Sequence, residues 1–384
     1  MKKELFLAVA TLVGFVVGAG ILGLPYVFSQ SGFLVGALNV VLIGLAVMVL
    51  NLMIGETSLR TKKIHQLVGY TGKYLGLNGK KIMLFFLSVE WFGAMVAYIV
   101  KIGEILSALI RPFIEIDPLI CSIIFALMGS YLIYKDLLLI EKSEFWLVTL
   151  TIIIILSIGI LCMPSLNPIN LQGFNIQHLW LPFGVTLFAF GGAGAIPEMR
   201  EELAKNKKLL KKAIIIGGLI PIALYLIFPL FIVGVTGSAT TEEGILGLAN
   251  ILGYKILLLG GFFAILAMST SFLAVGLAIK DIFKFDMKKT NLNSTMLACI
   301  VPLIVSILVV LLKIDKVFYN VIDMCGSVFY PFTGIIFVLT FWQAKVKGDR
   351  KPEYSLKFGK LLGILLIILF LLGFANKMMR TFFV

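Results

Sequence analysis

Apolar runs long enough to cross a membrane recur from one end of this 384-residue chain to the other. A helix of about 20 residues spans the hydrocarbon core of a bilayer, and lipid offers backbone polar groups no partner outside a helix or a closed barrel. The alternating segments of about ten residues that a transmembrane β-barrel shows are absent. With 60% hydrophobic and 14% charged residues, the sequence predicts an all-α polytopic membrane protein.

Hydropathy over a window of about 19 residues predicts eleven transmembrane helices. Lys2 and Lys3 before the first apolar run also fit a cleaved signal peptide, which is the alternative for that segment. The predicted spans are 5–28, 33–59, 82–110, 118–134, 144–162, 179–199, 209–235, 254–280, 293–312, 317–342 and 357–375.

The positive charges divide unevenly between the two sides of the membrane. If the N-terminus is cytoplasmic, 26 of the 33 Lys and Arg residues fall in inside segments. Cytoplasmic loops retain cationic side chains, so we expect a multi-pass cell-membrane protein with a cytoplasmic N-terminus and an extracellular C-terminus. Charges scattered at span ends, despite the net charge of +13, favour contact with the lipid bilayer over any nucleic-acid partner.

Two predicted helices carry glycines at corresponding places. Gly18-Ala19-Gly20, followed by Pro25, is matched 174 residues later by Gly192-Ala193-Gly194, followed by Pro197. Five spans separate the copies, so the second enters the membrane from the opposite side. This pattern is typical of inverted-repeat secondary transporters. It predicts a single transmembrane transporter domain with repeats at 4–162 and 178–342 and an extra helix at 356–376.

Glycine interruptions expose backbone groups in a place where lipid cannot satisfy them. Free amides at the start of a second half-helix, near Gly20, suit a carboxylate. Carbonyls near 13–17 and 189–191 suit an ammonium group or a cation. A zwitterion meets both demands, so the interruptions predict an amino acid site. Isolated glycines elsewhere are explained by helix packing.

The segments "GAGILGLPYVFSQSG" (18–32) and "FAFGGAGAIPEMREEL" (188–203) resemble those of amino acid permeases of the APC superfamily, most closely its amino acid/auxin permease branch. The resemblance implies a LeuT-type 5+5 inverted repeat with broken helices 1 and 6 and one extra C-terminal helix. It also implies that Gly18, Ala19 and Gly20 bind the substrate carboxylate and that Phe190, Gly191 and Gly192 lie at its amino group. The Phe190 ring would act as an occluding gate, or only pack.

Two coupling ions remain open. In sodium-coupled relatives of this type, carbonyls of the first span and hydroxyls of the eighth form a sodium site, which implies Val13, Val16, Ala267, Thr270 and Ser271. The alternative is that these hydroxyls bond their own helix. The lack of lysine in 144–162, where some proton-coupled relatives carry one, favours sodium.

Intramembrane acids supply the other possibility. Glu90 lies about 14 Å into the third span at 1.5 Å per residue, and a carboxyl there is a candidate proton carrier or gate, or a structural hydrogen-bond acceptor. Glu198, near a span end, is a candidate gate or an ordinary ion-pair partner.

Other classes of protein fit the sequence less well. An enzyme would need clustered catalytic groups, and the two histidines and four isolated cysteines supply neither these nor a metal site. A channel would need pore rings rather than two broken helices. The sequence therefore predicts a monomeric, cation-coupled amino acid symporter without a cofactor. Trp91, Phe92 and Phe190 suggest import of a neutral apolar or aromatic substrate by alternating access.

Overall fold

The computed structural model describes residues 2–135, 139–242, 244–314 and 316–383, and all regular elements in these ranges are helical. The predicted all-α fold is confirmed. Its α-helices are α1 (Lys2–Val16), α2 (Gly20–Ser31), α3 (Phe33–Arg60), α4 (Leu67–Ile110), α5 (Pro118–Tyr134), α6 (Leu139–Cys162), α7 (Phe183–Ala189), α8 (Ala195–Glu202), α9 (Leu210–Thr236), α10 (Ile245–Leu252), α11 (Tyr254–Asp281), α12 (Asn291–Leu311), α13 (Val317–Met324), α14 (Tyr330–Lys347) and α15 (Gly359–Phe383).

Eight of the described helical segments are long and apolar enough to cross a membrane, and the pair α1 and α2, bent by 56°, would make a ninth. The helix α5 is apolar but shorter, and α7 and α8 are two short halves. Helix α4 begins earlier than the predicted span, at Leu67, and Gly76 interrupts it with φ 77°. The count of eleven transmembrane helices stays a prediction.

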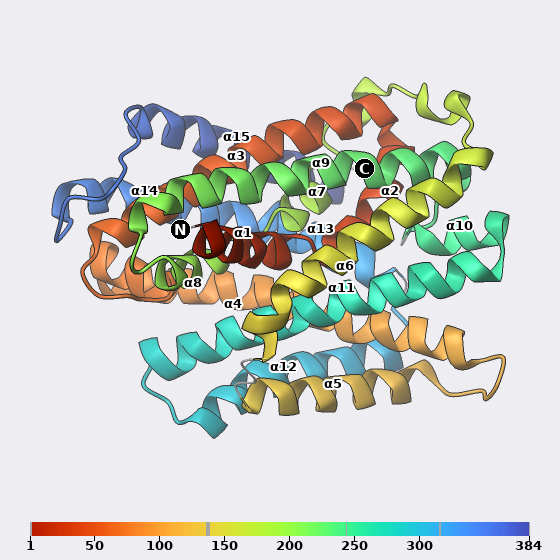
Figure 1. The fold of residues 1–384 in the computed structure, drawn as a ribbon, viewed down its shortest axis with the longest axis horizontal. Coiled ribbons are helices and arrows are strands. Elements are labelled where there is room, and N and C mark those ends of the chain that lie inside the picture. Colours follow the sequence, from red (N-terminus) through yellow and green to blue (C-terminus); the bar gives the residue numbers. More distant parts are fainter. Residues whose placement is uncertain (1, 136–138, 243, 315, 384) are drawn as a thin grey trace.

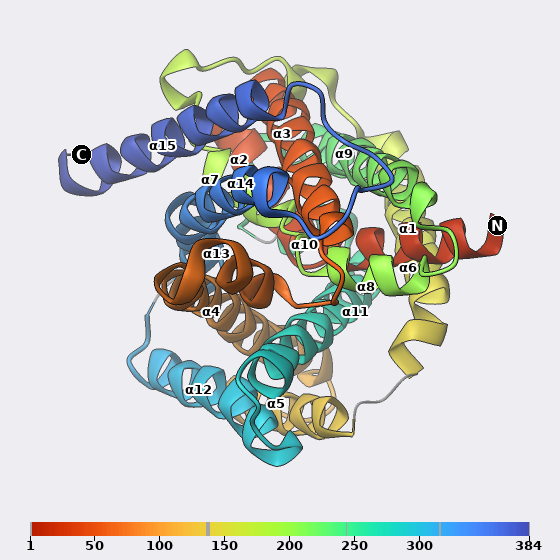
Figure 2. The same cartoon turned by 90° about the vertical axis from the view of Figure 1, so that its left-hand side faces the viewer.

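The long helices run along the long axis of the molecule (Figure 1). Seen along that axis, α5 and α12 lie at one edge of the bundle, while α15 lies at the opposite edge against α14 (Figure 2). At one end of the bundle, the α3–α4 connection contacts both Arg200 of α8 and the α14–α15 connection. We call this the basic end, because Arg60, Lys73 and Arg200 meet there.

The tenth predicted span is not a continuous α-helix. A π-helical turn, η7 (Cys325–Phe329), separates α13 from α14. It lies against α7, and a Cβ on Gly326 would come within 1.8 Å of the Gly184 carbonyl oxygen, so only glycine fits there. Turns of this kind often mark functional sites in helices. Here the π turn directly precedes Tyr330 and Thr333, which face α4.

Candidate binding site at the two helix breaks

The two glycine segments interrupt their helices and touch each other. Helix α1 ends at Val16 and α2 begins at Gly20, while α7 ends at Ala189 and α8 begins at Ala195. A Cβ on Gly20 would lie 2.4 Å from the Ala189 Cα atom. Side chains essentially never approach so closely, so glycine at position 20 allows the two breaks to meet.

The breaks leave several amides without hydrogen-bond partners. Gly18 N donates to Val16 O at 2.9 Å, but across the described chain no hydrogen bond uses the amides of Ala19 or Gly20. The same holds for the amides of residues 192–194 at the second break. Buried amides are nearly always paired, so these groups are available to a ligand or water.

A tyrosine hydroxyl joins the two breaks. The Oη atom of Tyr225, from α9, lies 2.6 Å from Val16 O and 2.8 Å from Ala189 O. The Tyr225 side chain is fully buried, and its ring packs against Phe190 at 4.9 Å between centroids. Sequence reasoning missed Tyr225. Its one signal was a polar group within an apolar span.

A pocket opens where the breaks meet α4 and α11. We call it the break pocket. It includes four of the predicted substrate residues, Gly18, Ala19, Gly20 and Gly191. Sequence reasoning missed Tyr98 and Phe188, although Trp91, Ala94 and Tyr98 recur at helical spacing on α4. Its lining is Phe15, Val16, Gly18, Ala19, Gly20, Glu90, Trp91, Ala94, Tyr98, Phe188, Ala189, Gly191, Ser271 and Val275.

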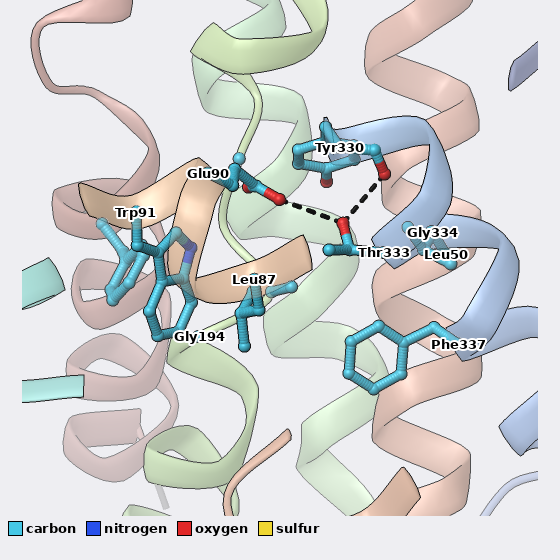
Figure 3. Close-up of a pocket in the computed structure, with 12 residues that line it drawn as sticks. Leu50, Leu87, Glu90, Trp91, Gly194, Tyr330, Thr333, Gly334 and Phe337 are labelled. Atoms are coloured by element: carbon cyan, nitrogen blue, oxygen red, sulfur yellow. Dashed lines mark hydrogen bonds between the residues drawn. The ribbon is translucent and has the colours of Figure 1, made fainter. Parts of the chain in front are cut away.

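A second pocket adjoins the first. Because Leu87 precedes Ala94 on α4 and Phe337 follows Tyr330 on α14, it lies nearer the basic end. We call it the Glu90 pocket, and Figure 3 shows the side chains that line it. Phe15, Glu90, Trp91 and Gly191 line both pockets. The Glu90 pocket is lined by Phe15, Leu50, Leu87, Glu90, Trp91, Gly191, Ala193, Gly194, Tyr330, Thr333, Gly334 and Phe337.

The buried Glu90 carboxyl group has one hydrogen-bond partner within the described ranges, Thr333. The Thr333 Oγ1 atom lies 3.0 Å from Glu90 Oε2 and 2.8 Å from the Tyr330 carbonyl oxygen (Figure 3). A hydroxyl has one proton. When Thr333 donates to the carbonyl, the contact with Glu90 is a hydrogen bond only if Glu90 itself carries a proton. Glu90 was predicted to lie near the middle of the membrane. In the structure it lies at the border of the two pockets.

The residues predicted to bind sodium come together only in part. A Cβ on Gly18 would lie 1.7 Å from Ser271 Oγ and 3.6 Å from Ala267 O, so α11 meets the first break. Ser271 Oγ is buried without a partner in the described structure. The Thr270 Oγ1 atom instead lies 3.1 Å from Leu266 O and 2.9 Å from Ala267 O, so its one proton is donated within its own helix.

The two carbonyls predicted for the sodium site accept other hydrogen bonds. Val13 O accepts from Val17 N at 2.7 Å. Val16 O accepts from Gly18 N and from Tyr225. A cation at this place would have to compete with these donors.

Four further predicted residues, Phe92, Phe190, Gly192 and Glu198, lie outside both pockets. The Phe190 ring packs between Tyr225 and α3, where a Cβ on Gly44 would lie 2.8 Å from its Cζ atom. Gly192 faces α1, and its Cβ would lie 2.4 Å from a methyl group of Val16. Glu198 is half-buried on α8.

Arg200, which sequence reasoning also missed, is almost fully buried at the basic end. Its Nη2 donates to Thr61 O at 2.6 Å, and its Nη1 donates to Tyr70 Oη at 2.8 Å. A cation at the C-terminal carbonyls of a helix, here α3, is favoured by the helix dipole. Burial and the positive charges of Lys73 and Arg200 lower the pKa of nearby His65, which keeps that ring neutral at pH 7.

Comparison with known proteins identifies similar chains. A sequence model of the tryptophan/tyrosine permease family matches residues 1–378. The tyrosine-specific transport system 1 of Haemophilus influenzae is 24% identical over 384 residues, covering 93% of this chain and 92% of that protein. Glutamine transporter 2 of Aliivibrio fischeri is 23% identical over 316 residues, covering 79% and 81%.

Solved structures share the fold. The crystal structure of MhsT in complex with L-phenylalanine superposes with a TM-score of 0.68 at 16% identity, covering 100% of this chain and 99% of that one. At this identity the likeness concerns the fold alone. It supports the predicted LeuT-type architecture with its two broken helices.

Proposed function

Because the chain belongs to the tryptophan/tyrosine permease family, we propose that this amino acid transporter imports an aromatic amino acid by cation-coupled alternating access. The observation that carries the proposal is the break pocket, where backbone amides without partners lie beside aromatic side chains. The name of the similar Haemophilus influenzae protein, a tyrosine-specific transport system, supports an aromatic substrate.

The roles of the pocket residues follow from charge and shape. The amides of Ala19 and Gly20 receive the substrate carboxylate, in the segment that starts at Gly18. Carbonyls of the segment 189–191, in which Ala189 and Gly191 line the pocket, receive the amino group. The rings of Phe15, Trp91 and Phe188 line the same pocket and contact an apolar or aromatic side chain. Burial of such a ring contributes about 1.5–3 kcal/mol.

Either sodium or a proton could be the coupling ion, and different residues support each of the two. Sodium would bind at Ser271, whose buried oxygen lacks a partner in the described chain, with Ala267, Thr270 and the carbonyls of Val13 and Val16. A proton would bind at Glu90, where the contact with Thr333 can be completed by a protonated carboxyl group. The two ions make opposite predictions for Ser271→Ala and Glu90→Gln variants.

The proposal includes the arrangement predicted from the sequence. The chain acts as a monomer in a cell membrane, with its N-terminus cytoplasmic, its C-terminus extracellular, and repeats at 4–162 and 178–342 followed by the extra helix at 356–376. The basic end then faces the cytoplasm. The likeness of its two motifs to those of amino acid/auxin permeases supports membership of the wider APC superfamily, which is part of the proposal.

Uptake into liposomes tests substrate and ion together. Purified protein is reconstituted and given labelled tyrosine, tryptophan, phenylalanine, glutamine or alanine in sodium or potassium buffer, with or without a proton uncoupler. We expect aromatic amino acids to accumulate. Uptake that needs sodium and fails in Ser271→Ala supports the sodium site, whereas uptake that the uncoupler abolishes and Glu90→Gln lacks supports the proton. Folded protein that transports no aromatic amino acid would contradict the proposal.

A further inference from the structure

The polar groups of the two pockets lie at different places. The break pocket carries free backbone amides at one side, which suit a charged carboxylate. The Glu90 pocket adjoins it through the four residues that line both, and its wall is otherwise largely apolar, with Leu50, Leu87 and Phe337. Glu90 and Trp91 line both pockets, so a ligand whose charged head binds the free amides and whose ring lies beside Trp91 would share its site with the Glu90 carboxyl group.

The Glu90 carboxyl group has an unused acceptor at this border. Its Oε2 atom contacts Thr333, and no hydrogen bond within the described residues uses Oε1. Many other acidic side chains of the protein form ion pairs, but within the described ranges Glu90 forms none, so no cation occupies its carboxyl group. Oε1 is therefore open to a hydrogen-bond donor from a ligand, and such a donor offsets part of the cost of a carboxyl group inside a membrane-spanning helix.

A second polar group lies on the same wall. Tyr330 is buried, its ring lines the Glu90 pocket (Figure 3), and its hydroxyl oxygen has no hydrogen-bond partner in the described chain. The carboxyl of Glu90 can accept a hydrogen bond, while the hydroxyl of Tyr330 can donate one. Together they match a ring hydroxyl, which both donates and accepts. Glu90 alone matches a ring N–H group, which only donates.

We propose that Glu90 and Tyr330 determine specificity by recognising a hydrogen-bonding group on the ring of the substrate, so that the site selects amino acids with a phenol or an indole over those with a plain phenyl ring. This inference rests on the proposed function and adds the two residues that recognise the ring. Sites built to bind a substrate donor reject the analogue that lacks it, because buried polar groups are then left unpaired.

Equilibrium binding to purified protein tests the inference without requiring transport. Competition against labelled tyrosine is measured for tyrosine, tryptophan, phenylalanine, O-methyltyrosine and 1-methyltryptophan. We expect tyrosine and tryptophan to bind at least about tenfold more tightly than phenylalanine and the two methylated analogues. Equal binding of all five would overturn the inference and leave the proposed function standing.

Variants separate the two residues. With labelled phenylalanine as the reporter ligand, Glu90→Met should remove the advantage of both tyrosine and tryptophan while phenylalanine still binds, which also shows that the variant is folded. Tyr330→Phe should lower the affinity for tyrosine but leave the affinity for tryptophan unchanged, because the indole N–H group cannot accept a hydrogen bond from the Tyr330 hydroxyl. Tyr26→Phe, outside both pockets, is the matched control.

Other outcomes are equally decisive. If Glu90→Met lowers the affinity for all aromatic amino acids to the same degree, Glu90 acts on something they share, either the amino group or a coupling proton, and the inference is wrong. Wild-type protein that is folded by circular dichroism but binds none of the five ligands contradicts the proposed function itself.

Discussion

At the scale of single residues, the hydroxyl of Tyr225 determines how the two breaks are held together. It lies within hydrogen-bond distance of Val16 O and Ala189 O, yet it has one proton to donate. The two carbonyls must share that donor. The contact joins α1 to α7 through a third helix, α9, and it gives buried carbonyls a partner that lipid cannot supply.

We expect Tyr225→Phe to destabilise the protein by about 1–3 kcal/mol, because it leaves a buried carbonyl without its donor. Thermal unfolding in detergent, followed by circular dichroism, should show a lower midpoint than wild type. The control is Tyr26→Phe, a half-buried tyrosine that contacts the ring of Tyr319. If both variants unfold at the wild-type temperature, the hydroxyl does not stabilise the breaks.

Residues of the site differ in how far the sequence could predict them. The breaks at Gly18–Gly20 and 192–194 were predictable, because closely spaced glycines weaken a helix locally. Tyr225 was not, because its partners include Val16, 209 residues away, and a tyrosine in an apolar span carries no sign of its contacts. For Phe190 the motif left two roles open, an occluding gate or plain packing, and in this structure its ring packs against Tyr225.

At the scale of elements, α8 is tied to its neighbours at the basic end. Arg200 holds it to the end of α3 and the start of α4, and Glu202 accepts a hydrogen bond from Thr11 of α1 at 2.8 Å. The halves of both broken helices that lie at this end are thereby fixed together. The Glu90 pocket lies on the same side, so separation of α8 from α3 would open it.

We expect Arg200→Gln to open the basic end, because charge-assisted hydrogen bonds contribute about 1.5–3 kcal/mol each. A Leu87→Cys substitution places a thiol in the lining of the Glu90 pocket. Its reaction with a maleimide should be at least about tenfold faster in the Arg200→Gln background. Lys205→Gln, which removes an exposed charge just beyond α8, should leave the rate unchanged. An unaltered rate in folded Arg200→Gln protein would show that Arg200 does not close this end.

The helices themselves were largely predictable, while their irregularities were not. Hydropathy predicted α3, α5 and α9 closely, because each is an apolar run bounded by polar residues. It could not predict the π turn at Cys325–Phe329, since that turn fits α13 and α14 against Gly184 of α7, a contact between distant segments. The early start of α4 was missed because the segment before Gly76 is less apolar than a membrane span.

At the scale of the whole molecule, the contacts of the basic end agree with the division of charge in the sequence. The connections after α3, α8 and α14 all reach this end, where Lys73 pairs with Asp349 and Arg60 pairs with Glu56 at 2.7 Å. The sequence predicted that each of these three connections is cytoplasmic, because each is rich in Lys and Arg. Segments that share one end of the bundle must lie on one side of a membrane. The distribution of Lys and Arg and the contacts in the structure therefore group the same connections on one side.

Thiol labelling in intact cells can therefore determine the orientation. The four native cysteines are buried, so an introduced thiol at an exposed position should report alone. We expect a membrane-impermeant maleimide to label an Arg111→Cys variant in intact cells, and to label a Lys205→Cys variant only after the membrane is permeabilised, because cytoplasmic loops retain the positive charges. Wild-type protein, with buried thiols alone, is the control for background. Labelling of Lys205→Cys but not Arg111→Cys in intact cells would invert the molecule and place the basic end outside, so that the Glu90 pocket would open toward the exterior.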